Sequence, residues 1–526
     1  MWCRLMAGGR DDYGNHMTNE TFTRLTRRAL LTGGAAFVAG AAVAGPPQTL
    51  RPTARPVISS GTPPLPEGIR PVVRQSAVDL IAAAGLAGQV GFVIADHATG
   101  AILESVDASA GRPPASVTKA LTTLYGLETL GADHRFATRV LATGPVVEGV
   151  LDGDLILAGG GDPNLVTDEL ATLAASVAAA GVTRVTGRLL VWGGGLPGVK
   201  EIEPGQLDQL GYNPALGGLN LNYNRVFFEW ARTGTAYTVT MDARSETRRP
   251  AVKTARIRVV DRAQPVYTYV EGPGVDEWTV AQGALGKAGS RWLPVRFPTM
   301  YAGEVFHTLA REAGITMPVP QEIAELPAGQ EVARFESVPL REMLRDMLLY
   351  STNLTAESVG MSATSRRKGE AQALTASAQS MAVWFKDRAG IAPHLADHSG
   401  LSDANRVSAG QMVALLNADA VEPQLHPLMK SIAMVDAKRK AIPDFPAQVR
   451  AKTGTLNFVS TLAGYLVTDS GRTLSFAIFA YDPGAREASL SSLDEQPAGA
   501  AAFNGKAKSL QQDLLQRWAV LGRISG

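Results

Sequence analysis

The 526-residue chain contains a single cysteine, Cys3, close to its N-terminus. Removal of the N-terminal leader described below leaves no cysteine, which excludes disulfides, a thiolate nucleophile and cysteine-ligated metal sites. The sequence also lacks a Cys/His cluster, an Asp-rich loop and a Gly-rich phosphate loop. The stretch GGGDP at 159–163 has no following Lys-Ser/Thr and is interpreted as a turn. The sequence therefore predicts neither a cofactor nor a metal site.

An excess of charge of either sign is absent as well. The 50 Lys and Arg residues nearly balance the 49 Asp and Glu residues, for a net charge of +1. No basic stripe or charge block points to nucleic acid or an anionic membrane surface as a partner. The apolar content of 45% is ordinary for a globular chain, and the length is sufficient for two or three domains with their own cores.

Long hydrophobic runs are missing, apart from one weak run near the start. Arg27 and Arg28 precede a mildly apolar, glycine-rich stretch at 29–44 that ends in small residues. This pattern predicts a twin-arginine signal peptide over 1–44 and export to the periplasm or beyond the cytoplasmic membrane. The run is too short and glycine-rich for a stable membrane span. Cleavage would lower the net charge to about −1, and a Pro-rich linker is predicted at 45–70.

The rest of the chain is predicted to be an α/β unit with a long interruption. Two strands within 88–107 and a helix after Ser116 belong to the first part; helices and a strand pair make up the last. Between them, many short β-like runs with turn signals predict a β-rich insert of one or two modules, which also contains a helix at about 168–180. The predicted divisions are 71–137 and 336–526 for the two halves of the outer unit and 138–335 for the insert. A final helix is expected over about 506–521.

The first motif with a chemical meaning is the stretch RPPASVTKALTTLYGLETLG at 112–131. Ser116 and Lys119 are one helical turn apart, so they share a face of the helix and the amine can accept the hydroxyl's proton. The alternative is a capping serine followed by a solvated lysine. A second Ser-x-x-Lys occurs at Ser365–Lys368, and we expect it to be a solvated, charged helix face.

Two further motifs follow in the sequence. Ser351 and Asn353 lie where one predicted helix gives way to the next, and both side chains can face a cleft. Helix caps are the alternative interpretation. Lys452–Thr455, with the sequence KTGT, lies on a predicted strand, where the missing side chain of Gly454 would let a ligand backbone lie alongside.

The three motifs, in this order, are those of penicillin-binding proteins and serine β-lactamases. The chain resembles the class C low-molecular-mass penicillin-binding proteins, a serine peptidase family of D-alanyl-D-alanine carboxypeptidases and endopeptidases. The likeness extends to PASVTK, GDLILAGGGDP, YNPALGGLNLNYN, DHSGLSDANRVSA and AKTGTLNFVSTLAGYL, and covers about 75–520. It implies a penicillin-binding/β-lactamase-like transpeptidase domain interrupted by a β-rich two-module insert. Thr352 departs from the family's usual Asp or Asn, and its side chain is expected to point away.

The residues themselves indicate amide chemistry at Ser116. A serine hydroxyl needs a base before it can attack an amide, and Lys119 is the local one. Lys119 must be neutral part of the time, which requires burial or a neighbouring cation. Lys452 can supply that cation.

The resemblance implies the remaining roles. Ser351 would relay a proton to the leaving amine and Asn353 would hold the substrate's peptide group. Lys452, Thr453 and Thr455 would recognise a terminal carboxylate. The backbone N–H groups of Ser116 and Thr455 would bind the oxyanion.

The resulting prediction is an exported serine D-alanyl-D-alanine carboxypeptidase/endopeptidase that acts on peptidoglycan stem peptides and cross-links through an acyl-enzyme on Ser116. β-Lactam antibiotics would be its covalent inhibitors. One alternative is a β-lactamase, because EPQLH at 422–426 superficially resembles a deacylation loop, although it lacks that loop's asparagine and the insert is too long. The other is a non-catalytic protein that binds the cell wall or senses penicillin.

Overall fold

The structure is a computed structural model, and it describes residues 75–524. The predicted signal peptide (1–44) and linker (45–70) lie outside the described residues. Within 75–524, no helix is both long and apolar enough to span a membrane.

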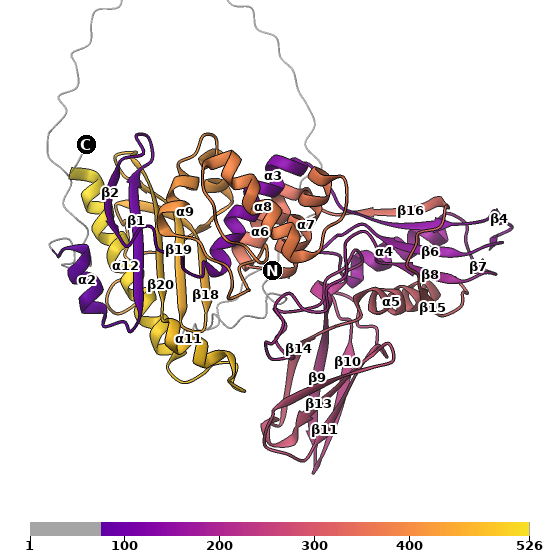
Figure 1. The fold of residues 1–526 in the computed structure, drawn as a ribbon. Helices are drawn as coiled ribbons and strands as arrows, with labels where there is room; N and C mark the ends of the chain where they lie inside the picture. Colours follow the sequence, from indigo (N-terminus) through magenta and orange to yellow (C-terminus); the bar gives the residue numbers. More distant parts are fainter. Residues whose placement is uncertain (1–74, 525–526) are drawn as a thin grey trace, which may run out of the picture. The chain divides into compact units, whose positions relative to one another are not determined.

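A six-stranded antiparallel sheet joins the two ends of the described chain. Its strand order is β17-β18-β19-β20-β1-β2, so the first strand pairs with the last along its whole length (Figure 1). The strands are β1 (Gln89–Asp96), β2 (Ile102–Val106), β17 (Lys430–Ser431), β18 (Ala447–Leu456), β19 (Val459–Thr468) and β20 (Thr473–Tyr481). The unit that begins near 75 is therefore completed only by residues that follow the long interruption.

Helices cover both faces of this sheet, because alternate residues of a strand point to opposite sides. Phe92 and Ile94 of β1 belong to a core that includes Trp518, whereas Val93 and Ala95 belong to the core on the other face. The first face carries α2 (Ala77–Ala84) and α12 (Ala500–Ile524); the second core is built with α3 (Thr118–Leu130), α6 (Leu340–Tyr350), α7 (Asn353–Lys368), α8 (Leu374–Ala389) and α9 (Ala409–Leu416).

The last helix is longer than the sequence predicted. The predicted span of 506–521 is wrong at its start, because α12 begins at Ala500. Ala500 and Phe503 are buried against Phe458, so packing extends the helix by more than a turn beyond the region of clear periodicity.

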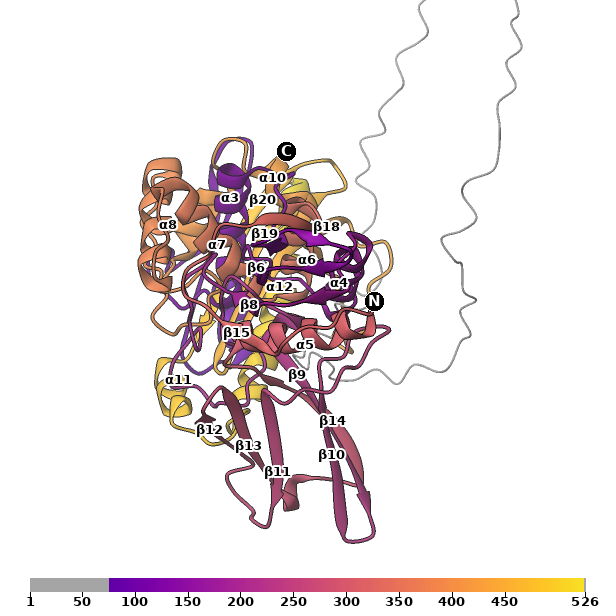
Figure 2. The ribbon, with the colours of Figure 1, turned by 90° about the vertical axis from the view of Figure 1, so that its right-hand side faces the viewer.

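The segment between the two halves is rich in strands, as predicted, and also contains α4 (Thr167–Ala179) and α5 (Pro298–Glu312). Its largest sheet has the order β15-β8-β6-β3-β16, and two three-stranded sheets have the orders β10-β9-β14 and β11-β13-β12 (Figure 2). These strands are β3 (Ala137–Ala142), β6 (Leu155–Gly159), β8 (Leu189–Trp192), β9 (Arg225–Thr233), β10 (Ala236–Asp242), β11 (Ala255–Val260), β12 (Tyr267–Gly272), β13 (Val275–Ala281), β14 (Ala288–Pro294), β15 (Pro320–Glu322) and β16 (Gln330–Glu336).

Short elements complete the chain. They are β4 (Val146–Val147), β5 (Val150–Leu151), β7 (Arg184–Val185), α10 (Glu422–Leu425), α11 (Pro483–Leu490) and the 3₁₀ turns η2 (Ala115–Val117), η3 (Asn222–Asn224), η4 (Gln282–Ala284) and η5 (His426–Leu428).

The inserted segment leaves and returns at neighbouring positions. β16 pairs antiparallel with β3, with Glu336 opposite Ala137, and the Phe136 amide donates to the Ser337 hydroxyl at 3.0 Å. Because its two ends are adjacent, roughly two hundred residues can be accommodated without separating α3 from α6 and α7. The helices of the outer unit can then pack as if they were continuous in sequence.

Candidate active site

The turn that carries Ser116 is held by close backbone contacts on two sides. Ala115 precedes it with φ +46°, a conformation that costs a non-glycine residue free energy. A Cβ on Gly454 of β18 would lie 2.9 Å from the Pro114 carbonyl oxygen, and one on Gly400 would lie 1.8 Å from the Ala115 carbonyl oxygen. Both glycines thus permit the close approach that holds Ala115 in its unfavourable conformation and fixes the turn that carries Ser116.

Lys119 lies one turn further on, at the start of α3, with its side chain fully buried. Its Nζ donates to the Ser116 Oγ at 3.0 Å, to the Asn353 Oδ1 at 2.7 Å and to the Ser399 carbonyl oxygen at 2.8 Å. The contact between Ser116 and Lys119 suggested by the sequence is therefore present. The amine is buried and makes three hydrogen bonds, so it is not a solvated charge. In its neutral form such an amine can accept the hydroxyl proton.

Burial lowers the pKa of Lys119 to about 8, because an ammonium loses its hydration in the interior. Asp397 and Glu357 oppose this shift by stabilising the charged form. Desolvation, rather than the neighbouring cation Lys452 considered from sequence, is thus the main reason why Lys119 is easier to deprotonate than an ordinary lysine.

Ser351 and Lys452 form a second hydroxyl–amine pair. Ser351 ends α6 in the left-handed conformation, with φ +62°, and its Oγ accepts a hydrogen bond from the Lys452 Nζ at 3.0 Å. Lys452 is 1% exposed and also donates to the Thr453 carbonyl oxygen at 2.8 Å. A cation is therefore fixed beside the second serine.

Asn353, the first residue of α7, links the two halves of the site to the inserted segment. Its Oδ1 accepts from Lys119, and its Nδ2 donates to the Tyr212 carbonyl oxygen at 2.8 Å. Thr352, the departure from the family pattern, donates its hydroxyl to Thr355 at 2.9 Å. Its side chain is thus occupied within its own helix.

The β18 motif alternates as a strand should. Lys452 and Gly454 are buried, whereas Thr453 and Thr455 are exposed. The structure gives Gly454 a second role, in addition to the room for a ligand backbone that the sequence predicts. A Cβ there would lie 2.1 Å from the Thr461 Oγ1 as well as against the turn before Ser116, so the glycine makes room for the protein's own packing.

Two buried acids beneath the site were not found from the sequence. Glu357, one turn after Asn353, accepts hydrogen bonds from the backbone amides of His398 at 2.8 Å and Ser399 at 2.9 Å. Asp397 accepts from the amides of Gly400 and Ser402. Burial raises the pKa of both carboxyl groups.

Glu357 is four residues after Asn353, so both lie on one face of α7. That spacing was the only signal for Glu357 in the sequence. The acids hold the loop that supplies the Ser399 carbonyl to Lys119.

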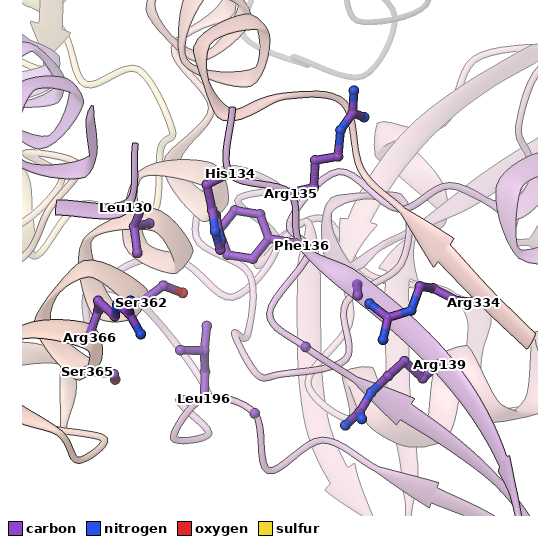
Figure 3. Close-up of a pocket in the computed structure, with 13 residues that line it drawn as sticks. Leu130, His134, Arg135, Phe136, Arg139, Leu196, Arg334, Ser362, Ser365 and Arg366 are labelled. Atoms are coloured by element: carbon purple, nitrogen blue, oxygen red, sulfur yellow. The ribbon is translucent and has the colours of Figure 1, made fainter. Parts of the chain in front are cut away.

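Ser365, in the second Ser-x-x-Lys, lies elsewhere. It lines a cavity of about 510 Å³ together with Leu130, Leu196 and Ser362 (Figure 3). Leu130 is the last residue of α3, so this cavity is about 20 Å along the helix from the start of the motif. The Arg366 to Lys368 stretch is exposed as expected, but the Ser365 Oγ is buried and has no hydrogen-bond partner in the described chain. The prediction that Ser365 is solvated is wrong, because its hydroxyl faces the protein.

Other sequence features lie outside this cluster. The EPQLH glutamate, Glu422, contacts the His426 Nδ1 at 2.5 Å. Among the described residues, no group of three His, Cys, Asp or Glu side chains is arranged to hold a metal ion.

The fold and the site together define a class of protein, the penicillin-binding proteins: a serine in contact with a buried lysine lies between a cluster of helices and a six-stranded antiparallel sheet. The model of the D-Ala-D-Ala carboxypeptidase 3 (S13) family matches residues 74–498. The chain belongs to this family and is a class C low-molecular-mass penicillin-binding protein.

Individual relatives of the chain agree with this family assignment. A D-alanyl-D-alanine carboxypeptidase from an Actinomadura species is 30% identical over 422 residues, which are 74% of this chain and 77% of the relative. The D-alanyl-D-alanine carboxypeptidase DacB of Haemophilus influenzae is 26% identical over 411 residues, 74% of this chain and 85% of the relative.

A solved structure supports the fold. The crystal structure of penicillin binding protein 4 from Haemophilus influenzae has a TM-score of 0.68 and 22% identity, and the match covers 84% of this chain and 99% of that one. The predicted fold class, a penicillin-binding fold with inserted domains, is confirmed. The prediction of a serine-type D-Ala-D-Ala carboxypeptidase is likewise confirmed by the family.

Proposed function

We propose that this chain is an exported carboxypeptidase and endopeptidase that cleaves D-alanyl-D-alanine stems and D-alanine-containing cross-links of peptidoglycan through an acyl-enzyme on Ser116. The observation that carries the proposal is the 3.0 Å contact between the Lys119 Nζ and the Ser116 Oγ, within a buried cluster that also contains Asn353. Hydroxyl, base and orienting groups are in place before any substrate binds.

In the acylation step, neutral Lys119 takes the proton of Ser116 as the Oγ attacks the carbonyl carbon of the penultimate D-alanine. The backbone N–H groups of Ser116 and Thr455 stabilise the oxyanion. The C–N bond then breaks, and the proton held by Lys119 passes through Ser351 to the leaving amine of the terminal D-alanine, which leaves Lys119 neutral again. Ser351 contacts Lys452 at 3.0 Å.

Recognition and hydrolysis use the same groups. Lys452, together with the exposed Thr453 and Thr455 and the backbone at Gly454, binds the terminal carboxylate, and Asn353 holds the peptide group. Water then attacks the ester carbon, Lys119 accepts its proton, and the Ser116 hydroxyl is restored as the acid product leaves.

β-Lactams are proposed to acylate Ser116 in the same way, because their strained amide and carboxylate imitate the D-alanyl-D-alanine end. A crystal structure of the Haemophilus influenzae penicillin binding protein 4 has been determined in complex with a β-lactam. Glu422, the residue that suggested a β-lactamase, is hydrogen-bonded to His426, so this contact does not favour that alternative.

We also propose the domain division 71–137, 138–335 and 336–526, with the inserted segment narrowing the choice of substrate. The contact between the Asn353 side chain and the Tyr212 backbone at 2.8 Å supports an influence of the insert on the site. Deletion of 138–335 with a short linker should impair cleavage of polymeric peptidoglycan; unchanged cleavage would refute this role.

The full function is tested by assaying the purified protein on a D-Ala-D-Ala tripeptide, on cross-linked muropeptides and on a fluorescent penicillin. Release of D-alanine, cleavage of cross-links and a stable penicilloyl adduct are expected. Rapid penicillin turnover would instead indicate a β-lactamase, and penicillin binding without peptide cleavage would indicate a non-catalytic sensor.

A further inference from the structure

A buried arginine lines a small cavity beside the second serine. Arg225, the first residue of β9, is 5% exposed. It lines a cavity of about 40 Å³ together with Tyr212 of the inserted segment and with Ser351 and Asn353. The cavity therefore joins the inserted segment to two residues of the candidate active site.

This arginine differs from the other buried arginines of the described chain. Arg112 pairs with Asp107, and Arg486 pairs with Asp403. Arg296, also 5% exposed, donates to the carbonyl oxygens of Lys200, Asn213 and Asp208. All three guanidinium groups pair with an acid or with carbonyl oxygens of the protein, although the Nε atoms of Arg112 and Arg296 have no hydrogen-bond partner in the described chain.

The guanidinium of Arg225 has neither an acidic partner nor a carbonyl partner among the described residues. Its Nε is buried without a hydrogen bond. The nearest favourable contacts of its guanidinium are the rings of Tyr223 at 5.4 Å and Trp292 at 5.8 Å. Stacking on aromatic rings stabilises a cation but leaves its N–H donors unused.

An unpaired buried cation is costly because it has lost its hydration without gaining an anion. Burial lowers the pKa of Arg225 to about 10, so the side chain still carries its charge at neutral pH. A folded protein keeps such an arrangement at a net cost unless a ligand supplies the missing negative charge.

We propose that Arg225 is a substrate-binding residue of the active cleft that pairs with a carboxylate of the peptide substrate, on the acyl side of the bond that is cleaved. This inference rests on the proposed peptidase function and adds a specificity determinant to it. The guanidinium fork matches a carboxylate with two parallel hydrogen bonds.

The size of the cavity and the neighbouring groups favour this ligand. About 40 Å³ exceeds the roughly 10–15 Å³ that a single water requires, so there is room for a small group such as a carboxylate. Lys452 and the exposed hydroxyls of Thr453 and Thr455 already provide for the C-terminal carboxylate. The remaining anion is therefore a side-chain carboxylate upstream of the two D-alanines.

The test compares two peptides, acetyl-Glu-D-Ala-D-Ala and acetyl-Gln-D-Ala-D-Ala, with the full chain and its Arg225→Gln variant. The unaltered protein should favour the glutamate peptide. The variant should raise KM for that peptide about tenfold or more, the usual range for a lost charged hydrogen bond, with kcat and the glutamine peptide little affected. Arg225→Lys should restore part of the preference.

Arg232→Gln is the matched control, because Arg232 lies on the same strand but its side chain is exposed, donates to the Gly234 carbonyl and lies over the Tyr237 ring. It should change neither KM. The melting temperature supplies a second readout: Arg225→Gln should leave it unchanged or raise it, since an unpaired buried charge is removed.

The outcomes are distinct. An equal rise in KM for both peptides would place the C-terminal carboxylate at Arg225 and overturn the upstream assignment. Unchanged KM values, or a lower melting temperature with a loss of activity on both peptides, would overturn the proposal in favour of a hydrated or structural arginine. Penicillin acylation of Ser116 tests the peptidase function separately; if it fails in the unaltered protein, the proposed function fails, whatever Arg225 does.

Discussion

Glu357 accepts the backbone N–H of Ser399 at 2.9 Å, and the carbonyl oxygen of that same residue accepts a hydrogen bond from Lys119 at 2.8 Å. A buried carboxylate on α7 therefore fixes the loop that holds the amine beside Ser116. The acid acts on the amine in two ways, through this loop and through its charge. Because the charge of Glu357 affects the pKa of Lys119 whereas the loop affects its position, the pH dependence of the reaction can separate the two effects.

Glu357→Gln should shift the pH dependence of acylation. The negative charge of Glu357 raises the pKa of Lys119, so its removal lowers that pKa. The acidic limb of the rate profile should then move to lower pH. Stopped-flow acylation by a chromogenic penicillin between pH 5 and about 9 measures this shift.

A purely structural role for Glu357 would reduce the rate at every pH and leave the midpoint of the limb in place. Glu342→Gln provides the control, because Glu342 is an exposed acid in the first turn of α6. It should leave both the rate and the midpoint unchanged.

In the unaltered protein, the acylation rate should rise with pH up to about 8 and then level off, because Lys119 must lose its proton before it can act as a base and its pKa is lowered to about 8. Lys119→Ala should reduce the rate by roughly a hundredfold or more. Lys368→Ala, in the second Ser-x-x-Lys, should have no effect. A rate that is independent of pH between about 6 and 8 would argue against Lys119 as the base.

Ser116→Ala should abolish both penicillin labelling and peptide cleavage, since among the described residues no other hydroxyl is hydrogen-bonded to the Lys119 Nζ. Ser365→Ala should change neither, because Ser365 lies in the separate cavity near the end of α3. Mass spectrometry of the trapped adduct identifies the labelled residue. A penicilloyl group on another serine would disprove the assignment.

Gly400→Ala should slow acylation by displacing the backbone that precedes Ser116. Gly400 has φ +80°, and a Cβ there would lie 1.8 Å from the Ala115 carbonyl oxygen. The backbone before Ser116 must shift, with a cost of about 1–3 kcal/mol and a slower acylation. Gly198→Ala is the control, because no atom lies within 4 Å of a Cβ there. Comparable melting temperatures and acylation rates for both variants would contradict the idea that the close approach of Gly400 to Ala115 fixes the turn before Ser116.

Export is expected to depend on the paired arginines. Replacing Arg27 and Arg28 with lysine should retain the protein in the cytoplasm, because the twin-arginine pattern is the feature that marks the leader. N-terminal sequencing of the exported form should start near Gly45. Secretion that is unaffected by the double replacement would refute this route.

The sequence by itself determined the motifs and their order, and with them the family. Local patterns gave the strand pair β1–β2 and the helix after Ser116, because hydrophobic periodicity records which face each element buries. Short-range spacing also brought Ser116 to Lys119, since residues three apart meet on one helix face whatever surrounds them.

Only the tertiary structure decided what lies beneath and around those motifs. In the sequence, nothing distinguishes Glu357 and Asp397 from other acids; they become important because the loop at 397–402 packs against α7. Arg225 likewise looks like an ordinary strand residue in the sequence, and only its burial in the folded protein removes its hydration. Gly454 and Gly400 are required by backbones distant in the sequence. Burial, loss of hydration and close approach between distant segments depend on the complete packing. That packing lowers the pKa of Lys119 and leaves Arg225 without an acidic partner among the described residues.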